Sequence, residues 1–236
     1  MTARLPGVAA LVTVVAGVGG LGGLGILGAG CGAAERIAVL STRDPADYPC
    51  VLHDPHTLGR DFTVRQNLMI HTEHDGKPVD GQLEGIVQKR GDTLLIMGLG
   101  PMNVKTFTIE QRGERIEFHQ FVGPELPFSP RNILVDVHRV FFKRLPPPAP
   151  EELHRVDGAD AVQRGELDGE TVVETWRDGS LHDAVFTRPG SALRGAIRVE
   201  FGPGCTTGAC QPESAMLRNE WFGYTLAINN DGYEQL

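Results

Sequence analysis

The stretch FTVRQNLMI at residues 62–70 decides the fold class of this chain. Phe62, Val64, Gln66, Leu68 and Ile70 occupy one phase of a two-residue period, and mostly polar residues occupy the other. Successive side chains of a strand point to opposite faces, so this alternation predicts a strand with one buried face. The turn pair Asp75-Gly76 follows it.

Comparable patterns recur along the rest of the chain. We expect a short helix or strand at residues 37–40, and strands at 81–89, 94–97, 104–111, 115–122, 171–176, 181–187, 193–201, 216–222 and 224–229. Short turns such as Arg112-Gly113 and Asp178-Gly179 separate neighbouring strands. Short connections of this kind indicate antiparallel pairing.

One segment has helical spacing instead. Ser129 is a typical N-cap with Pro130 in the first helical position, and apolar residues then recur every three or four positions as far as Phe141. This predicts an amphipathic helix from Ser129 to Lys143, whereas residues 149–168 are polar and suit a connector or a loosely packed short helix. The fold class is therefore mainly β within the α+β class. We expect an antiparallel half-barrel or barrel of about nine to eleven strands, with the helix covering its open side.

The N-terminal residues have the features of an export signal that ends in a lipidated cysteine. Arg4 precedes an uncharged run at residues 5–30, and small residues lead directly to Cys31. This arrangement resembles the bacterial lipoprotein signal, although Gly28 stands where the usual motif has Leu. A plain cleaved signal and a retained transmembrane anchor are the alternatives, but nine of the first 30 residues are glycine, which disfavours a helix.

These features divide the chain into three parts. We expect a signal peptide at residues 1–30, a lipid-anchored tether at 31–48 and a single domain at 49–236, with acyl chains on Cys31. Gly32 after the cysteine resembles lipoproteins sent to the outer membrane, so we expect a bacterial outer-membrane location that faces the periplasm.

The charge of the chain argues against two classes of partner. The formal net charge is −8 at pH 7, and the lysines and arginines are scattered among acidic residues. Nucleic-acid binders normally show a basic patch, and charge-held membrane proteins show a polybasic segment. We therefore expect no nucleic-acid partner, and attachment to the membrane through the lipid on Cys31.

The remaining cysteines suggest an oxidising compartment. Cys205 and Cys210 enclose a short Gly-containing loop and predict a structural disulfide. A metal or redox pair is the alternative, but no second pair accompanies them and the spacing is not Cys-x-x-Cys. We expect Cys50 to be a buried thiol rather than a nucleophile.

The sequence contains no recognisable catalytic set. Four histidines, His53, His56, His71 and His74, lie close together, but His71 and His74 would point to opposite faces of a strand. The H-E-x-x-H, G-x-S-x-G and Walker-type patterns are missing from the sequence. We therefore expect polar strand ends rather than a metal site, and a protein that is not an enzyme and carries no cofactor.

An apolar cavity beneath the helix is the remaining candidate for a functional site. Its expected lining is Phe62, Leu68, Leu94, Ile96, Phe107, Ile116, Phe118, Leu134, Phe141, Trp176, Val199 and Trp221. The same residues would also form an ordinary packed core, and the sequence leaves both interpretations open.

Four segments, residues 98–109, 115–117, 126–137 and 223–228, resemble a family of uncharacterised bacterial lipoproteins. Some members of that family are encoded beside aryl polyene biosynthesis genes. The family is similar in fold to LolA and LolB, the lipoprotein carrier and receptor in which a half-barrel and its helical lid hold acyl chains. The resemblance implies an envelope lipoprotein that binds or transfers a lipid or acylated molecule. A structural or adaptor lipoprotein that binds an envelope protein is the alternative.

Overall fold

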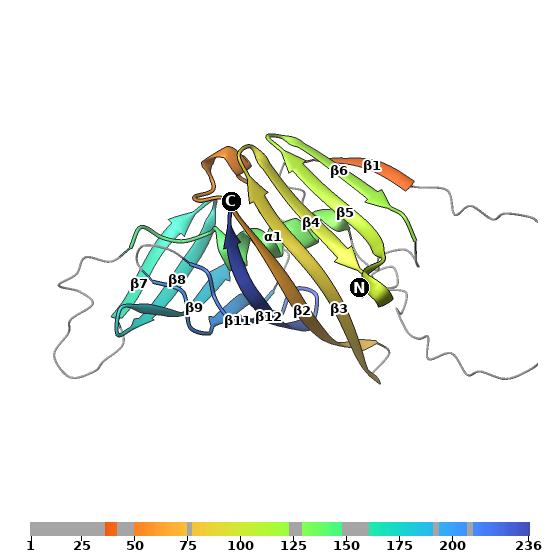
Figure 1. Cartoon of the computed structure of the whole chain (residues 1–236). Coiled ribbons are helices and arrows are strands. Elements are labelled where there is room, and N and C mark those ends of the chain that lie inside the picture. Colours follow the sequence, from red (N-terminus) through yellow and green to blue (C-terminus); the bar gives the residue numbers. More distant parts are fainter. Residues whose placement is uncertain are drawn as a thin grey trace, which may run out of the picture.

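The computed structural model describes residues 36–41, 50–74, 77–122, 129–147, 161–190, 194–206 and 210–236. The expected signal peptide, Cys31 and most of the tether lie outside these residues. Within the described part, the chain forms one twelve-stranded antiparallel sheet that curves around a single α-helix (Figure 1).

The elements follow one another along the chain in this order: β1 (Arg36–Ser41), the 3₁₀ turn η1 (Pro55–Thr57), β2 (Phe62–His74), β3 (Lys77–Arg90), β4 (Thr93–Leu99), the 3₁₀ turn η2 (Pro101–Asn103), β5 (Lys105–Arg112), β6 (Arg115–Gln120), α1 (Pro130–Phe141), β7 (Ala161–Leu167), β8 (Glu170–Arg177), β9 (Ser180–Thr187), β10 (Ile197–Phe201), β11 (Ser214–Asn219) and β12 (Tyr224–Gln235).

The sheet consists of two meanders joined through their long strands. The strand order is β1-β6-β5-β4-β3-β2-β12-β11-β10-β9-β8-β7, so β2 pairs with β12 and the described sheet ends at β1 and β7 without closing. Strand β12 changes register between Asn230 and Tyr233 where it pairs with β2. A register change of this kind bends a strand, which helps the sheet to curve.

The core lies between the curved sheet and α1. Strands β4, β5 and β6 alternate buried and half-buried side chains, as expected when one face is covered. Gly98 is required in β4 because a Cβ atom at this position would overlap the ring of Phe107 on β5. The absence of a side chain at Gly98 therefore leaves room for the buried Phe107 ring.

Helix α1 begins where the sequence predicts. The Ser129 side chain accepts a hydrogen bond from the Arg131 backbone N–H, and Pro130 occupies the first turn. The C-cap Phe142 donates its N–H to the His138 carbonyl. Every residue from Leu134 to Phe141 is buried, so the C-terminal half of the helix has no solvent-exposed face.

The structure has the fold class that the sequence predicts. The mainly β antiparallel architecture with one helix is confirmed, and the described sheet is open rather than a closed barrel. The expected connector at residues 149–168 is wrong at its C-terminal end, which forms the edge strand β7. Among the β7 residues only Ala161 is buried, so the apolar alternation that identifies a strand is missing there.

Several boundaries also differ from expectation. The residues predicted as a helix or strand at 37–40 form β1, which lies within the expected tether and pairs with β6. The strand predicted from residue 81 begins at Lys77, the strand predicted from 193 begins at Ile197, and the one predicted to reach 222 ends at Asn219. In the described part of the chain, no helix has the length and apolarity needed to span a membrane.

Candidate functional site

The twelve residues expected to line a cavity are brought together around α1. Ten of them are buried, and the other two, Leu68 and Trp221, are partly buried and pack against the same core. The rings of Phe62 on β2 and Phe141 on α1 lie 5.7 Å apart between centroids, within the range of favourable aromatic contact. The twelve side chains, two of them on α1 itself, therefore belong to or pack against one core between the helix and the sheet.

A hollow of about 340 Å³ is present at a different place on the molecule. Its lining comes from strands β9 to β12 and includes Glu200, Gly202, Met216 and Ala227. None of the twelve expected residues contributes to it. In the described residues, the twelve side chains therefore belong to or pack against the core, and the hollow has a different lining.

Two basic side chains of α1 and its C-terminal extension are buried against the β7–β8 turn. Arg139 Nη2 donates to Glu170 Oε1 at 2.7 Å, and Lys143 Nζ lies 2.8 Å from Asp168 Oδ2 and 3.5 Å from Glu170 Oε2. Arg139, Lys143 and Glu170 have almost no solvent exposure. We call these four residues the ionic seat of the helix.

The local sequence explains why the two carboxylates converge. Asp168 and Gly169 have φ angles of 55° and 75°, the left-handed conformation that a tight two-residue hairpin turn requires. This turn joins β7 to β8 and places Asp168 two residues from Glu170, facing the helix. Burial alone would raise the pKa of Asp168, but hydrogen bonds from Lys143 and His53 hold it below its usual value.

A chain of hydrogen-bonded polar side chains continues from the ionic seat. His53 Nε2 lies 2.6 Å from Asp168 Oδ2, and the His53 carbonyl accepts a hydrogen bond from Gln111 Nε2. The Gln111 Oε1 atom accepts from His138 Nε2 at 3.0 Å. Burial, reinforced by the positive charge of Lys143, lowers the pKa of His138 to about 3, so its imidazole is neutral.

The free thiol of Cys50 lies beside the same seat. Cys50 is buried, as the sequence predicts, and burial raises the pKa of its thiol. Burial by itself would lower the pKa of Lys143, but interactions with Cys50, Asp168 and Glu170 raise it. Both shifts favour a protonated Lys143 and a protonated Cys50 thiol.

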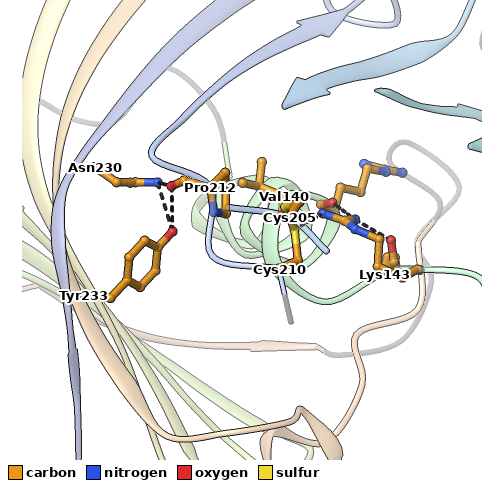
Figure 2. Close-up of a disulfide and its surroundings, with 9 residues drawn as sticks. Val140, Lys143, Cys205, Cys210, Pro212, Asn230 and Tyr233 are labelled. Carbon is orange, nitrogen blue, oxygen red and sulfur yellow. Dashed lines mark hydrogen bonds between the residues drawn. A yellow bond between two sulfur atoms is a disulfide. The ribbon is translucent and has the colours of Figure 1, made fainter. Parts of the chain in front are cut away.

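A disulfide loop closes the other side of the helix C-terminus. Cys205 and Cys210 form the disulfide that the sequence predicts, close to Val140 and Lys143 (Figure 2). Arg144 donates to the carbonyls of Arg139, Val140 and Lys143 and also to Cys210 Sγ at 3.3 Å. These bonds satisfy carbonyl groups that the last turn of a helix leaves without partners.

The disulfide loop is tied to the sheet as well as to the helix. The Pro212 carbonyl accepts hydrogen bonds from Asn230 Nδ2 at 2.6 Å and Tyr233 Oη at 2.9 Å, both on β12 (Figure 2). On the opposite side of α1, Tyr224 donates its hydroxyl to Asp136. The helix is therefore held by polar contacts along its length and by apolar contacts with the sheet.

The ionic seat was not predicted from the sequence. Helix α1 was predicted from its apolar residues, and Arg139 and Lys143 were given no role. Their spacing of four places both on one face of a helix, which was an available signal. Their partner Asp168 lies in the expected connector, and Glu170 directly precedes the strand expected at residues 171–176. No local pattern in the sequence indicates that these carboxylates pair with the helix.

The histidines expected at polar strand ends are distributed in different surroundings. His71 Nδ1 lies 2.6 Å from Asp80 Oδ1 on the exposed part of the β2–β3 hairpin. His53 instead contacts Asp168 of the ionic seat. His56 donates its backbone N–H to Asp54 within η1. Among the described residues, no group of three potential ligand side chains is arranged to hold a metal ion.

These features define a class of protein in which a curved open sheet wraps one helix and holds it by both apolar and ionic contacts. The chain belongs to the family described as "Protein of unknown function (DUF3261)", which matches residues 63–231. This confirms the assignment to an uncharacterised family. Comparison with curated proteins gave no match.

Three solved structures are similar to the chain at low sequence identity. A LolA superfamily protein from Nitrosomonas europaea has 12% identity and a TM-score of 0.42, with 75% of this chain and 86% of that chain covered. An outer membrane lipoprotein-sorting protein domain from Vibrio parahaemolyticus has 10% identity and a TM-score of 0.44, with 75% and 85% covered. A DUF1329 family protein from Desulfovibrio piger has 13% identity and a TM-score of 0.41, with 77% and 87% covered.

Proposed function

We propose that this protein is an envelope lipoprotein that binds or transfers a lipid or acylated molecule, and that α1 occupies the ligand's place in the closed arrangement. The observation that carries the proposal is the mixed character of the contacts that hold α1. Its apolar side chains cover the concave face of the sheet, whereas its C-terminal end rests on the ionic seat. Ion pairs can be exchanged for water when a helix leaves, and the departure of α1 would uncover an apolar surface suited to acyl chains.

The proposed position in the cell follows from the N-terminal residues. We propose that residues 1–30 are removed, that Cys31 carries the membrane anchor, and that residues 49–236 form the ligand-binding domain on the periplasmic side of the outer membrane. The lipoprotein-like signal at residues 1–31 and the resemblance to a family of uncharacterised bacterial lipoproteins support this arrangement. The ligand-binding residues would be the twelve apolar residues now packed around α1.

A second function is favoured by the packing itself. Ten of those twelve residues are buried in a continuous core. A permanently filled core suits a structural or adaptor lipoprotein that binds a protein partner in the envelope through its surface. The two functions differ in whether α1 can leave the sheet.

Binding of a fluorescent anthroyloxy-labelled fatty acid separates the two functions. The full chain with Cys31→Ser is compared with the same chain carrying Glu170→Gln, which removes a charge from the ionic seat. Because apparent affinity scales with the fraction of open molecules, Glu170→Gln should bind the probe several-fold more tightly. The matched control is Glu84→Gln, since Glu84 lies on β3, pairs with Arg65 and belongs neither to the seat nor to the hollow.

Circular dichroism would verify that each variant remains folded at the temperature of the binding assay. Saturable binding at micromolar probe with tighter binding by Glu170→Gln supports the carrier function. The absence of saturable binding by the parent chain and by a folded Glu170→Gln variant would contradict it and favour the adaptor function.

A further inference from the structure

The connection between β4 and β5 exposes apolar side chains at one end of the sheet. Met102 in η2 is 92% exposed, and Val104 and Val122 are 46% and 43% exposed. The backbone N–H groups of Phe121 and Val122 both donate to the Thr106 carbonyl, so the segment after β6 lies against the start of β5. We call Met102, Val104, Phe121 and Val122 the Met102 rim.

The backbone of the Met102 rim is held in an unusual conformation. Met102 and Asn103 have φ angles of 58° and 60°, in the left-handed region that few residues other than glycine adopt. Asn103 accepts a hydrogen bond from Arg65 Nη2 at 2.7 Å, which fixes the turn to β2. An apolar side chain in this conformation and almost fully exposed to water contributes nothing to the core, and such outliers point to a role in binding.

A cation accompanies the apolar side chains. Lys105 Nζ lies 4.1 Å from the centre of the Phe121 ring, and Lys105 is itself exposed. Apolar side chains beside a lysine are the combination that favours the boundary between lipid headgroups and acyl chains.

The first strand places the expected lipid anchor at the same end of the sheet. In the β1–β6 pair, Arg36 lies opposite Gln120, the residue directly before Phe121 (Figure 1). Cys31 precedes Arg36 by five peptide links, which span at most about 18 Å when fully extended. An acyl chain on Cys31 would therefore enter the bilayer close to the Met102 rim.

We infer that the Met102 rim docks on the bilayer that holds the Cys31 anchor. The short segment that joins Cys31 to β1 determines which end of the sheet faces the lipid. This inference rests on the lipidation of Cys31 in the proposed function.

Depth-dependent quenching tests the orientation. The lipidated full chain carrying Met102→Cys is labelled with the fluorophore NBD and reconstituted in vesicles of phosphatidylethanolamine and phosphatidylglycerol that contain nitroxide-labelled lipids. The matched control is Val162→Cys on the edge strand β7, where Val162 is 66% exposed. The label at position 102 should be quenched several-fold more strongly than the label at 162, and equal quenching would overturn the inference.

Two further measurements test the short connection between Cys31 and β1 separately from the apolar contact of the Met102 rim. A flexible Gly-Ser insertion of about twenty residues between Cys31 and Arg36 should reduce quenching at position 102 several-fold, because it lowers the effective concentration of the rim at the membrane. Unchanged quenching would overturn the role of β1. Mass spectrometry of the same preparation must show acyl chains on Cys31, and an unmodified cysteine would also overturn the inference.

The contribution of Met102 is measured without the anchor. In the full chain with Cys31→Ser, Met102→Asn should lower partition into the same vesicles about tenfold, as expected for removing one apolar side chain from the interface. Asparagine tolerates positive φ, so the turn is retained. Met69→Asn, at a side chain 58% exposed on β2, is the matched control and should leave partition unchanged. These assays contain no fatty-acid probe, so a failure of ligand binding would leave their outcome unaffected.

Discussion

The neutral buried imidazole of His138 makes a prediction about the pH dependence of stability. His138 is 0% exposed, and its Nε2–H donates to Gln111 Oε1. Burial, with the nearby charge of Lys143, lowers its pKa from 6.5 to about 3. The unfolded chain therefore binds a proton between these two values that the folded protein does not bind.

The sign and size of the effect follow from this difference. The folded pKa is depressed, so the contribution of His138 is complete above pH 6.5 and is lost as the pH falls toward 3. One pH unit within this window corresponds to about 1.4 kcal/mol of unfolding free energy. Between pH 7 and pH 4.5 the protein should lose about 3 kcal/mol through this one group.

Urea denaturation followed by tryptophan fluorescence measures this loss, with Trp176 buried in the core as a reporter. His138→Gln supplies the comparison because its amide can donate to Gln111 and does not titrate. The parent chain should lose about 3 kcal/mol more than His138→Gln over that pH range. Parallel pH profiles for the two proteins would refute the assignment of a neutral, buried imidazole.

Three other substitutions test how α1 is held. Glu170→Gln removes the carboxylate that accepts from Arg139 Nη2 and should lower the unfolding free energy by about 3 kcal/mol in urea titrations. A loss below about 1 kcal/mol would show that water reaches the pair. Replacing Cys205 and Cys210 by serine should lower the unfolding free energy by about 2 kcal/mol in the same assay, as expected for a short closed loop. An unchanged value would show that the other bonds of the loop already constrain it. Ser129→Ala removes the N-cap and should lower the thermal midpoint by an amount equivalent to about 1 kcal/mol, and an unchanged midpoint would contradict the capping role.

Local sequence patterns predicted most of the secondary structure for identifiable reasons. Strand β10 and the first part of β2 alternate apolar and polar residues because one face is buried, and α1 carries its own N-terminal signal at Ser129 and Pro130. Strand β7 escaped prediction because it lies at the sheet edge with little buried surface. The pairing of β2 with β12 joins the two ends of the domain, and no local pattern encodes so distant a contact.

The candidate site was predictable only in part. The twelve apolar residues were expected to converge because they share one face of the sheet and helix, and they do. Whether such residues enclose a space or pack on one another depends on side-chain fit, which spacing along the chain does not determine. The ionic seat was missed because its basic and acidic members come from segments that meet only in the folded protein.

The energetics of the helix favour the exchange that the proposed function requires. Moving α1 away from the sheet would expose five buried apolar side chains, at about 2 kcal/mol for each, or about 10 kcal/mol together. They are Leu134, Val135, Val137, Val140 and Phe141. An acyl chain of about sixteen carbons gains about 0.8 kcal/mol for each buried CH₂ group, or about 12 kcal/mol, so it can offset that loss. A buried ion pair is seldom the most stabilising choice, since apolar side chains of equal volume often hold a structure more firmly. When α1 leaves the sheet, the charged side chains of the ionic seat become hydrated, and water solvates them well. Apolar side chains at the same place would add to the apolar surface that becomes exposed to water. The ionic seat therefore favours a helix that can be displaced by an acyl chain.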